Sequence, residues 1–394
     1  MARPLRIFIS VAEDSADVHA AALLRAAPDV LGHFTVAGLT GPRLRALGAE
    51  TVADLTAHAA MLGGVFGVAS RALAALRAVE QSWTRQRPDV LVVLDSPELH
   101  LGVPELRLRG MAPRARRRGI PVVYYIAPQT WASRPWRNAA IRRCVDTLAC
   151  ILPFEEAYFR SRAIDARFVG HPLFESLARE QPRPAMVARL RAGDAPLIAL
   201  LPGSRRGVLR RVLPLQLAVL GRLRRPFRCA VSAVDAERAG EISGVLAASP
   251  QPPALRGTIE ILTDENASLL SAADLVLVAS GTATLHVAHY RKPMIVMYDA
   301  GPLLGGAYEY FGRRIVATPH LSLVNLLADR RVVPEFMPTV PDPAEVAAVA
   351  DQLLSDHAWR ELMIAQLDEV VRPLETGSAS RGVCEIVRSV VNTT

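Results

Sequence analysis

Two turns rich in small residues carry the groups best suited to bind an anion. Pro202-Gly203-Ser204-Arg205 follows an apolar run that begins at Leu197, and Ser280-Gly281-Thr282 follows another that begins at Leu275. A helix-compatible segment comes after each turn, so backbone N–H groups would lie at a helix N-terminus, where partial positive charge favours an anion. Two such turns in one α/β domain predict a phosphate-bearing ligand at the carboxyl ends of the strands.

A carboxylate stands at the end of a third apolar run. Val90–Leu94 has the near-continuous apolar character of a strand that is buried on both faces of a parallel sheet, and Asp95 follows it directly. An aspartate at this position either caps the next helix or faces the ligand crevice. The residues alone leave both interpretations open.

The elements that must position these groups form two blocks in which strands alternate with helices. The predicted strands are Leu5–Ser10, Phe34–Leu39, Val90–Leu94, Val122–Ile126 and Leu148–Leu152, then the run from Leu197, Arg228–Ala233, Thr258–Leu262, Leu275–Ala279 and Met294–Tyr298. Gln181–Pro184 is the best candidate for a linker between the blocks. The pattern predicts an α/β protein with two Rossmann-like domains, residues 1–180 and 185–355, that face a central cleft. We expect helices over residues 356–394, which could pack back on the first domain.

Composition limits the class of protein. The 394 residues are 51% hydrophobic and 21% charged, which is typical of globular domains, and no window holds the roughly 18 apolar residues of a membrane span. The four cysteines show no CxxC spacing, so neither a zinc site nor a redox pair is indicated. Lys292 is the single lysine, which excludes a GxxxxGK[ST] phosphate loop.

The net charge of +8 suits nucleic acid, an anionic membrane surface or phosphorylated substrates. Nucleic acid is disfavoured because the arginines are scattered and the chain is 5% aromatic. The uncharged segment Ala59–Ser70 is either a buried corner between helices or a flexible flap that meets lipid. We expect a cytoplasmic protein, with peripheral contact to the cytoplasmic face of the inner membrane as a further hypothesis.

Taken together, nine short motifs resemble the lipid-A-disaccharide synthase family, which consists of inverting glycosyltransferases of the GT-B fold. Their order and spacing make the resemblance specific, although most are weak individually. The motifs are Ala12–Asp17, Met61–Gly64, Asp95–Pro97, Gln129–Trp131, Pro153–Glu155, Val169–Pro172, Leu201–Arg205, Ser280–Leu285 and Leu323–Leu327.

The resemblance implies transfer of a diacylglucosamine from UDP to the 6-hydroxyl of a diacylglucosamine 1-phosphate, with inversion and release of UDP, in lipid A biosynthesis. It implies that Asp95 is the general base. The implied diphosphate and nucleotide contacts are Gly203, Ser204, Arg205, Ser280, Gly281, Thr282, Ala283, Thr284, His286 and Asn325, and the implied acceptor contacts are Glu13, Ser15, Met61 and Gln129. No metal or other cofactor is implied. An inverting displacement needs one base and stabilisation of the leaving group, which these residues would supply.

Several positions depart from the family pattern. Ala12 and Ala16 stand where the family usually has glycine, and each would cost about 1–2 kcal/mol if the position required a positive φ. His286 replaces a glutamate that receives the ribose hydroxyls, and the loss of that charged hydrogen bond would weaken nucleotide binding about ten- to a hundredfold. Glu98-Leu99-His100 replaces the family's Asp-Phe-Asn.

Two other classes of function stay open. One is a different GT-B enzyme that uses a nucleotide sugar, either a transferase with another acceptor or an epimerase. The other is a non-catalytic descendant that binds lipid or partner proteins. For the first interpretation we expect a UDP-activated acylated amino sugar and an acylated sugar phosphate as binding partners, and a homodimer is a further hypothesis.

Overall fold

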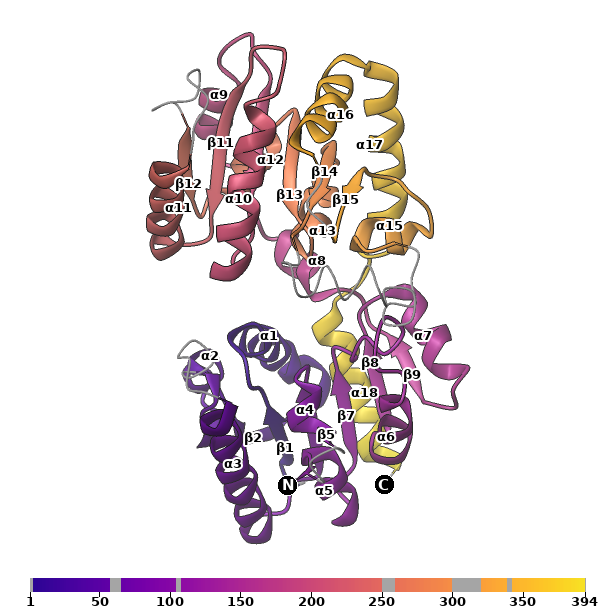
Figure 1. The fold of residues 1–394 in the computed structure, drawn as a ribbon. Coiled ribbons are helices and arrows are strands. Elements are labelled where there is room, and N and C mark those ends of the chain that lie inside the picture. Colours follow the sequence, from indigo (N-terminus) through magenta and orange to yellow (C-terminus); the bar gives the residue numbers. More distant parts are fainter. Residues whose placement is uncertain are drawn as a thin grey trace. The chain divides into compact units, whose positions relative to one another are not determined.

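The computed structural model describes residues 3–56, 65–103, 108–249, 259–299, 320–338 and 342–393. The chain divides into two compact units (Figure 1). Unit 1 comprises Met1–Glu175 and Leu374–Thr394, and unit 2 comprises Ser176–Pro373. Within the described residues, no helix combines the length and the apolar character needed to cross a membrane.

Unit 1 is built on a parallel sheet of seven strands in the order β3-β2-β1-β4-β7-β8-β9. The strands are β1 (Leu5–Ser10), β2 (Phe34–Leu39), β3 (Glu50–Ala53), β4 (Val90–Leu94), β7 (Val122–Tyr125), β8 (Thr147–Cys150) and β9 (Ala166–Phe168). The helices are α1 (Asp14–Leu31), α2 (Pro42–Ala46), α3 (Val65–Arg85), α4 (Pro97–His100), α5 (Met111–Arg117), α6 (Arg137–Cys144), α7 (Pro153–Arg160), α8 (Pro172–Leu177) and α18 (Ala379–Thr393). A short antiparallel pair, β5 (Gly102–Val103) and β6 (Leu108–Arg109), follows α4.

Alternation along the strands of unit 1 creates a core on each face of the sheet. Phe8 and Leu91 pack with Val79 and Trp83 of α3 on one face, and Ile9 packs in the core of the other face, which α1 and α18 cover. Because successive side chains of a strand point to opposite faces, a sheet covered on both sides needs apolar residues at nearly every position. The five residues of β4 are all buried for this reason.

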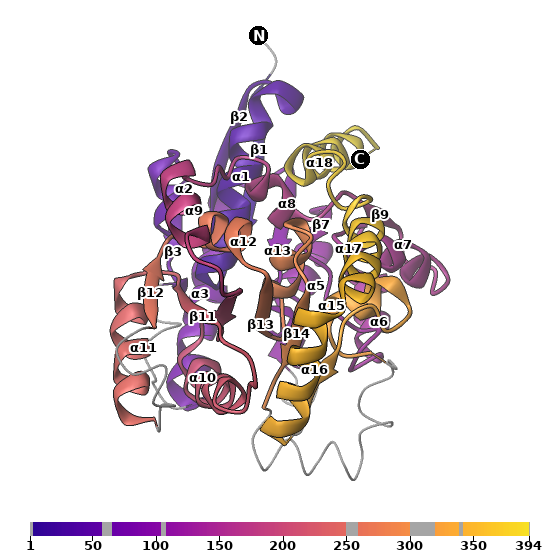
Figure 2. The same cartoon turned by 90° about the horizontal axis from the view of Figure 1, so that it is seen from above.

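Unit 2 contains a parallel sheet of six strands in the order β12-β11-β10-β13-β14-β15. The strands are β10 (Leu197–Leu201), β11 (Arg228–Ala233), β12 (Glu260–Thr263), β13 (Leu275–Ala279), β14 (Met294–Met297) and β15 (Glu335–Phe336). The helices are α9 (Pro184–Arg191), α10 (Arg206–Leu220), α11 (Ala236–Ala248), α12 (Asn266–Ala272), α13 (Ala283–His289), α15 (Leu323–Ala328), α16 (Pro343–Ser355) and α17 (His357–Val371). Helix α16 packs against both α10 and α17 (Figure 2).

Two parallel α/β sheets and a helical C-terminal segment confirm the predicted fold class. The central strands of both sheets lie at the apolar runs from which they were predicted. The short edge strand β3 was not predicted, because Glu50–Ala53 has neither an apolar run nor a clear alternation. The first helix, α1, begins at Asp14, four residues after the end of β1.

The units differ from the ranges expected for the domains. Helix α17 belongs to unit 2, where it packs on α13, α15 and α16, whereas α18 packs on α1 in unit 1. The first crossing between the units lies inside α8 and not at Gln181–Pro184. Glu175 accepts hydrogen bonds from Ser378 Oγ (3.2 Å) and from the backbone N–H of Ser380 (3.1 Å), which attaches the start of α8 to the start of α18.

Candidate functional site

In unit 1, two predicted site segments follow neighbouring strands. The strand order reverses between β1 and β4, because the chain moves outward from β1 through β2 and β3 before it returns to β4. In open α/β sheets, ligands bind at the carboxyl ends of the strands at such a reversal. Asp95 follows β4, and the exposed residues Glu13 and Ser15 follow β1. The topology therefore brings these three positions to one edge of the sheet.

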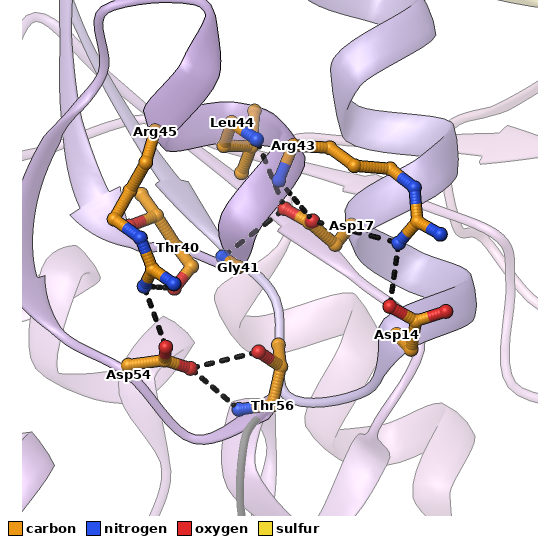
Figure 3. A network of polar contacts seen from close by, with 9 residues as sticks. All are labelled: Asp14, Asp17, Thr40, Gly41, Arg43, Leu44, Arg45, Asp54 and Thr56. Carbon is orange, nitrogen blue, oxygen red and sulfur yellow. Dashed lines mark hydrogen bonds and ion pairs between the residues drawn. The ribbon is translucent and has the colours of Figure 1, made fainter.

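The acidic residues of the opening turn have different roles. Asp17 is fully buried, and its carboxylate accepts from the backbone N–H groups of Gly41 (3.0 Å), Arg43 (2.8 Å) and Leu44 (3.3 Å) at the start of α2 (Figure 3). Asp14 forms an ion pair with the Arg43 guanidinium. Asp17 therefore stabilises the fold, whereas Asp14 forms a surface ion pair of the kind that contributes little to stability.

The two alanines of this turn cause no backbone strain. Neither Ala12 nor Ala16 has a positive φ, and Ala16 lies inside α1. A Cβ atom is therefore tolerated at both positions without the cost that a left-handed conformation would impose.

Asp95 lies in a strained backbone segment that buried side chains support. Its φ is +49°, and that of Ser96 is +43°, a conformation that costs about 1–3 kcal/mol per residue unless the surroundings hold it. The Asp95 carbonyl oxygen accepts hydrogen bonds from Tyr124 Oη and from His100 Nδ1, both at 2.6 Å. Burial raises the pKa of Tyr124 well above its usual value, so its hydroxyl stays a donor.

His100 connects the ends of β1 and β4. It is completely buried, and burial lowers its pKa to about 4, so the ring is neutral near pH 7. Because the Asp95 carbonyl can only accept, Nδ1 carries the proton of the neutral ring. Nε2 then accepts from Ser10 Oγ at 2.9 Å. One tautomer of His100 therefore fixes the backbone of Asp95 relative to β1.

Asp95 lines a pocket of about 230 Å³ together with Gln129, Arg134 and Arg137. Ser96, and not Asp95, is the N-cap residue of α4, so the interpretation of Asp95 as a helix cap is wrong. The predicted acceptor residue Gln129 is exposed in this pocket.

Four residues around Asp95 were not predicted as site residues: His100, Tyr124, Arg134 and Arg137. The roles of His100 and Tyr124 could not be read from the sequence, because Ser10 lies 90 positions from His100 and Asp95 lies 29 positions from Tyr124. The spacing of Arg134 and Arg137, soon after the Gln129–Trp131 motif, was a signal that could have been used.

In unit 2, the two small-residue turns also follow neighbouring strands at a reversal of strand order. Strand β10 pairs with both β11 and β13, and the chain completes β11 and β12 before it reaches β13. Gly203 has φ +99°, and a Cβ at this position would lie 3.0 Å from Val208 Cγ1 and 3.5 Å from Ala279 Cβ. Gly203 therefore lets the turn after β10 approach the end of β13 closely.

Arg205 is the exposed N-cap residue of the 15-residue helix α10. Its guanidinium has no hydrogen bond or ion pair within the described part of the chain. The next residue, Arg206, is bound to Glu237 and Glu241 of α11 instead. The first amides of a helix lack intrahelical acceptors and carry partial positive charge. This turn thus offers the backbone N–H groups of Gly203, Ser204 and Arg205. It also offers the Arg205 guanidinium, which pairs with no carboxylate among the described residues.

The second turn positions its residues through local contacts. Gly281 has φ +133°, the Ser280 N–H donates to Met297 O (3.2 Å), and the buried Thr284 hydroxyl donates to the Gly281 carbonyl (2.8 Å). Thr284 therefore stabilises the turn. Thr282 and Ala283 form the start of α13 next to it.

His286 lies beside the carboxylate of Glu180, a residue that was not predicted to be part of the site. Glu180 Oε2 is 3.2 Å from His286 Nε2, although the pair lacks hydrogen-bond geometry. The Glu180 side chain is 36% exposed and that of His286 is 11% exposed.

Asn325 has a role that differs from the expected nucleotide contact. It is fully buried, its Nδ2 donates to Val333 O (2.9 Å) and Glu335 Oε2 (3.0 Å), and its Oδ1 accepts from the N–H groups of Val332 and Val333. Four hydrogen bonds use the full capacity of an amide side chain. In this conformation Asn325 holds the segment before β15 and has no group left for a ligand.

Met61, the remaining predicted acceptor residue, lies outside the described residues, as do residues 59–64 of the Ala59–Ser70 segment. Among the residues that the structure describes, no group of three or more His, Cys, Asp or Glu side chains is arranged to hold a metal ion.

Comparisons with known proteins agree over almost the whole chain. A family model described as lipid-A-disaccharide synthetase matches residues 7–380. The lipid-A-disaccharide synthase of Anaeromyxobacter dehalogenans strain 2CP-1 is 36% identical over 394 residues, which cover 98% of this chain and 97% of the relative. The lipid-A-disaccharide synthase of Myxococcus xanthus is 34% identical over 390 residues, with coverages of 97% and 96%.

Solved structures with little sequence identity share the fold. MurG of Acinetobacter baumannii superposes with a TM-score of 0.56 at 15% identity and covers 98% of this chain and 100% of its own. Anabaena Alr3699/HepE in complex with UDP and glucose gives a TM-score of 0.55 at 12% identity with the same coverages. The two-sheet architecture is therefore that of GT-B glycosyltransferases. Because the family model and relatives above 30% identity cover nearly the entire chain, this protein belongs to the lipid-A-disaccharide synthase family.

Proposed function

We propose that this chain transfers a diacylglucosamine from UDP to the 6-hydroxyl of a diacylglucosamine 1-phosphate, with inversion, in lipid A biosynthesis. Family membership supports the reaction class. One observation carries the proposal. In each unit the predicted reactive groups follow strands at which the strand order reverses: Asp95 in unit 1 and Gly203–Arg205 in unit 2. HepE, which has the same fold, was solved with UDP, in agreement with a nucleotide-sugar donor.

The proposed reaction is a single displacement. The Asp95 carboxylate accepts the proton of the acceptor's 6-hydroxyl while that oxygen forms a bond to the anomeric carbon of the donor. The bond from the anomeric carbon to the diphosphate oxygen breaks on the opposite side, and UDP leaves with the electron pair. Arg205 and the amides of Gly203 and Ser204 stabilise the charge on the diphosphate, as preorganised donors do for a developing anion. The Asp95 proton then passes to solvent.

UDP release in the presence of both acylated sugars tests the proposal. Asp95→Asn keeps the shape of the side chain but removes the base, so turnover should fall by about 10²–10⁴-fold while UDP binding stays unchanged. Arg205→Ala should weaken UDP binding about ten- to a hundredfold, because a charged hydrogen bond is lost. Arg210→Ala, an exposed change on the same helix, is the matched control and should behave like the wild type.

Unchanged turnover in Asp95→Asn would place the base elsewhere, and Glu98 would be the next candidate. UDP release that does not require the sugar phosphate would favour another nucleotide-sugar enzyme. No UDP binding by the wild type would leave the non-catalytic alternative.

A further inference from the structure

We propose that Arg134 and Arg137 form a subsite that binds the phosphate of the acceptor, and that Glu98 occupies this subsite when no acceptor is bound. The inference rests on the function proposed above, because it assumes an acceptor that is a sugar phosphate. It assigns the discrimination between a phosphorylated and an unphosphorylated acceptor to two residues outside the motifs that carry the family resemblance.

Both guanidinium groups converge on one carboxylate oxygen. Glu98 Oε1 lies 2.9 Å from Arg134 Nη1 and 2.5 Å from Arg137 Nη2. Burial raises the pKa of Glu98, but the hydrogen bond and charge of Arg137, together with the charge of Arg134, outweigh burial and leave the pKa below its usual value. The group therefore contains two positive charges and one negative charge, with a net charge of +1.

The exposure of the three side chains differs in a way that suits exchange of one anion for another. The Arg137 side chain is 15% exposed, whereas those of Arg134 and Glu98 are each 53% exposed. The salt bridge between Glu98 and Arg134 is exposed on both sides, and exposed pairs contribute little to stability, so a stronger anion can displace the Glu98 carboxylate. The less exposed Arg137 is fixed at the start of α6 and would form the constant part of the subsite.

Arginine suits this task because its planar guanidinium presents paired N–H groups that match the oxygens of a phosphate. A phosphate dianion offers three oxygens and about two charges to the pair, and Glu98 engages the two guanidiniums through one oxygen. The N-terminus of α6, where Arg137 lies, adds partial positive charge. The phosphate should therefore replace the carboxylate with a gain in electrostatic energy.

The position of the subsite matches the chemistry of the acceptor. Arg134, Arg137 and Asp95 line the same pocket, whose volume of about 230 Å³ suits a sugar phosphate head group and not an entire lipid. The 1-phosphate of the acceptor is on C1 and its nucleophilic 6-hydroxyl is on the carbon attached to C5, and both C1 and C5 flank the ring oxygen. Two guanidiniums that hold the phosphate would therefore keep the 6-hydroxyl in the same pocket that Asp95 lines.

The test compares two acceptors, diacylglucosamine 1-phosphate and the same sugar without phosphate. Arg134→Gln and Arg137→Gln should each lower kcat/KM for the phosphorylated acceptor about ten- to a hundredfold, since each removes a charged hydrogen bond. Neither substitution should change kcat/KM for the unphosphorylated acceptor by more than about threefold. The same limit applies to KM for the donor. Arg142→Gln, an exposed change on the same helix α6, is the control and should match the wild type with both acceptors.

Glu98→Gln provides a second readout that loss of folding cannot imitate. It removes the competing carboxylate, so KM for the phosphorylated acceptor should fall and KM for the unphosphorylated acceptor should stay the same. Equal losses with both acceptors in the arginine variants, or unchanged discrimination between them, would overturn the subsite.

Failure of the proposed function has a different signature. If the wild type transferred to neither acceptor, calorimetry with glucosamine 1-phosphate would still test the subsite in the wild type and in the double variant Arg134→Gln/Arg137→Gln. Binding that is lost in the double variant supports the subsite, and absence of binding to the wild type or equal binding to both contradicts it.

Discussion

At the scale of single residues, His286 departs from the family pattern and lies beside a carboxylate from elsewhere in the chain. The resemblance implies a glutamate at this position for the ribose hydroxyls, yet the Glu180 carboxylate lies 3.2 Å from the histidine ring. A carboxylate is therefore present beside position 286, although it comes from the segment that follows α8.

This arrangement predicts that His286→Glu weakens UDP binding instead of restoring it. Two carboxylates about 4 Å apart near a protein surface repel by several kcal/mol, and even strong screening by water should leave a loss of about three- to tenfold in affinity. The double variant His286→Glu/Glu180→Gln removes the repulsion and should bind UDP at least as well as the wild type in calorimetry. Tighter binding by the single variant would instead show that the histidine has simply degraded the donor site.

At the scale of elements, Glu155 joins the pocket segment around Gln129 to the start of α7. Its carboxylate accepts from Trp131 Nε1 (3.0 Å) and from the N–H groups of Ile151 (3.1 Å) and Leu152 (3.0 Å). Burial raises its pKa from 4.5 to about 7, despite these hydrogen bonds. The folded protein therefore binds this proton more tightly than the unfolded chain does.

The raised pKa predicts the direction of a pH effect on stability. A carboxyl whose pKa is higher in the folded state stabilises the fold fully below pH 4.5, and this contribution is lost as the pH rises towards 7. The stabilisation lost over this range is on the order of 3 kcal/mol. Urea unfolding of the wild type should show that the free energy of unfolding falls as the pH rises across this range. Glu155→Gln should remove this part of the dependence of the unfolding free energy on pH, even if the variant is less stable at every pH. An identical slope in both proteins would contradict the prediction.

At the scale of the whole molecule, the chain ends in the unit in which it begins. After the helices of unit 2, α18 packs on α1 and buries an apolar face that includes Val383, Ile386 and Val387 (Figure 1). Helix α18 therefore belongs to unit 1, and one face of the sheet of this unit depends on it.

This dependence predicts that a cavity in α18 destabilises unit 1. Ile386→Ala should lower the free energy of unfolding by about 2–5 kcal/mol, the usual range for a truncated core side chain. Intrinsic fluorescence in urea is a suitable probe, because Trp83, Trp131 and Trp136 lie in unit 1 and Trp359 lies in unit 2. Arg388→Ala, an exposed change on the same helix, should alter stability by no more than about 0.5 kcal/mol. Equal effects of the two changes would mean that α18 is not part of the core of unit 1.

Much of the architecture follows from local sequence patterns. The apolar runs at Leu5–Ser10, Val90–Leu94 and Leu275–Ala279 coincide with strands, because a parallel strand buried on both faces needs an apolar residue at nearly every position. Gly203 has the positive φ that a tight turn after β10 requires. These properties depend on neighbours in the chain, so the residues themselves determine the two α/β blocks and the turns at the ends of their strands.

Tertiary structure decided which polar groups serve the fold and which remain available to a ligand. The motifs contain both Asn325 and Arg205, yet packing engages every hydrogen-bonding group of Asn325 and leaves the Arg205 guanidinium without a partner among the described residues. His100 reaches Ser10 across 90 positions of sequence. Contacts of this kind depend on strand order and burial, which are cooperative properties of the packed sheet, and no local pattern of residue types encodes them.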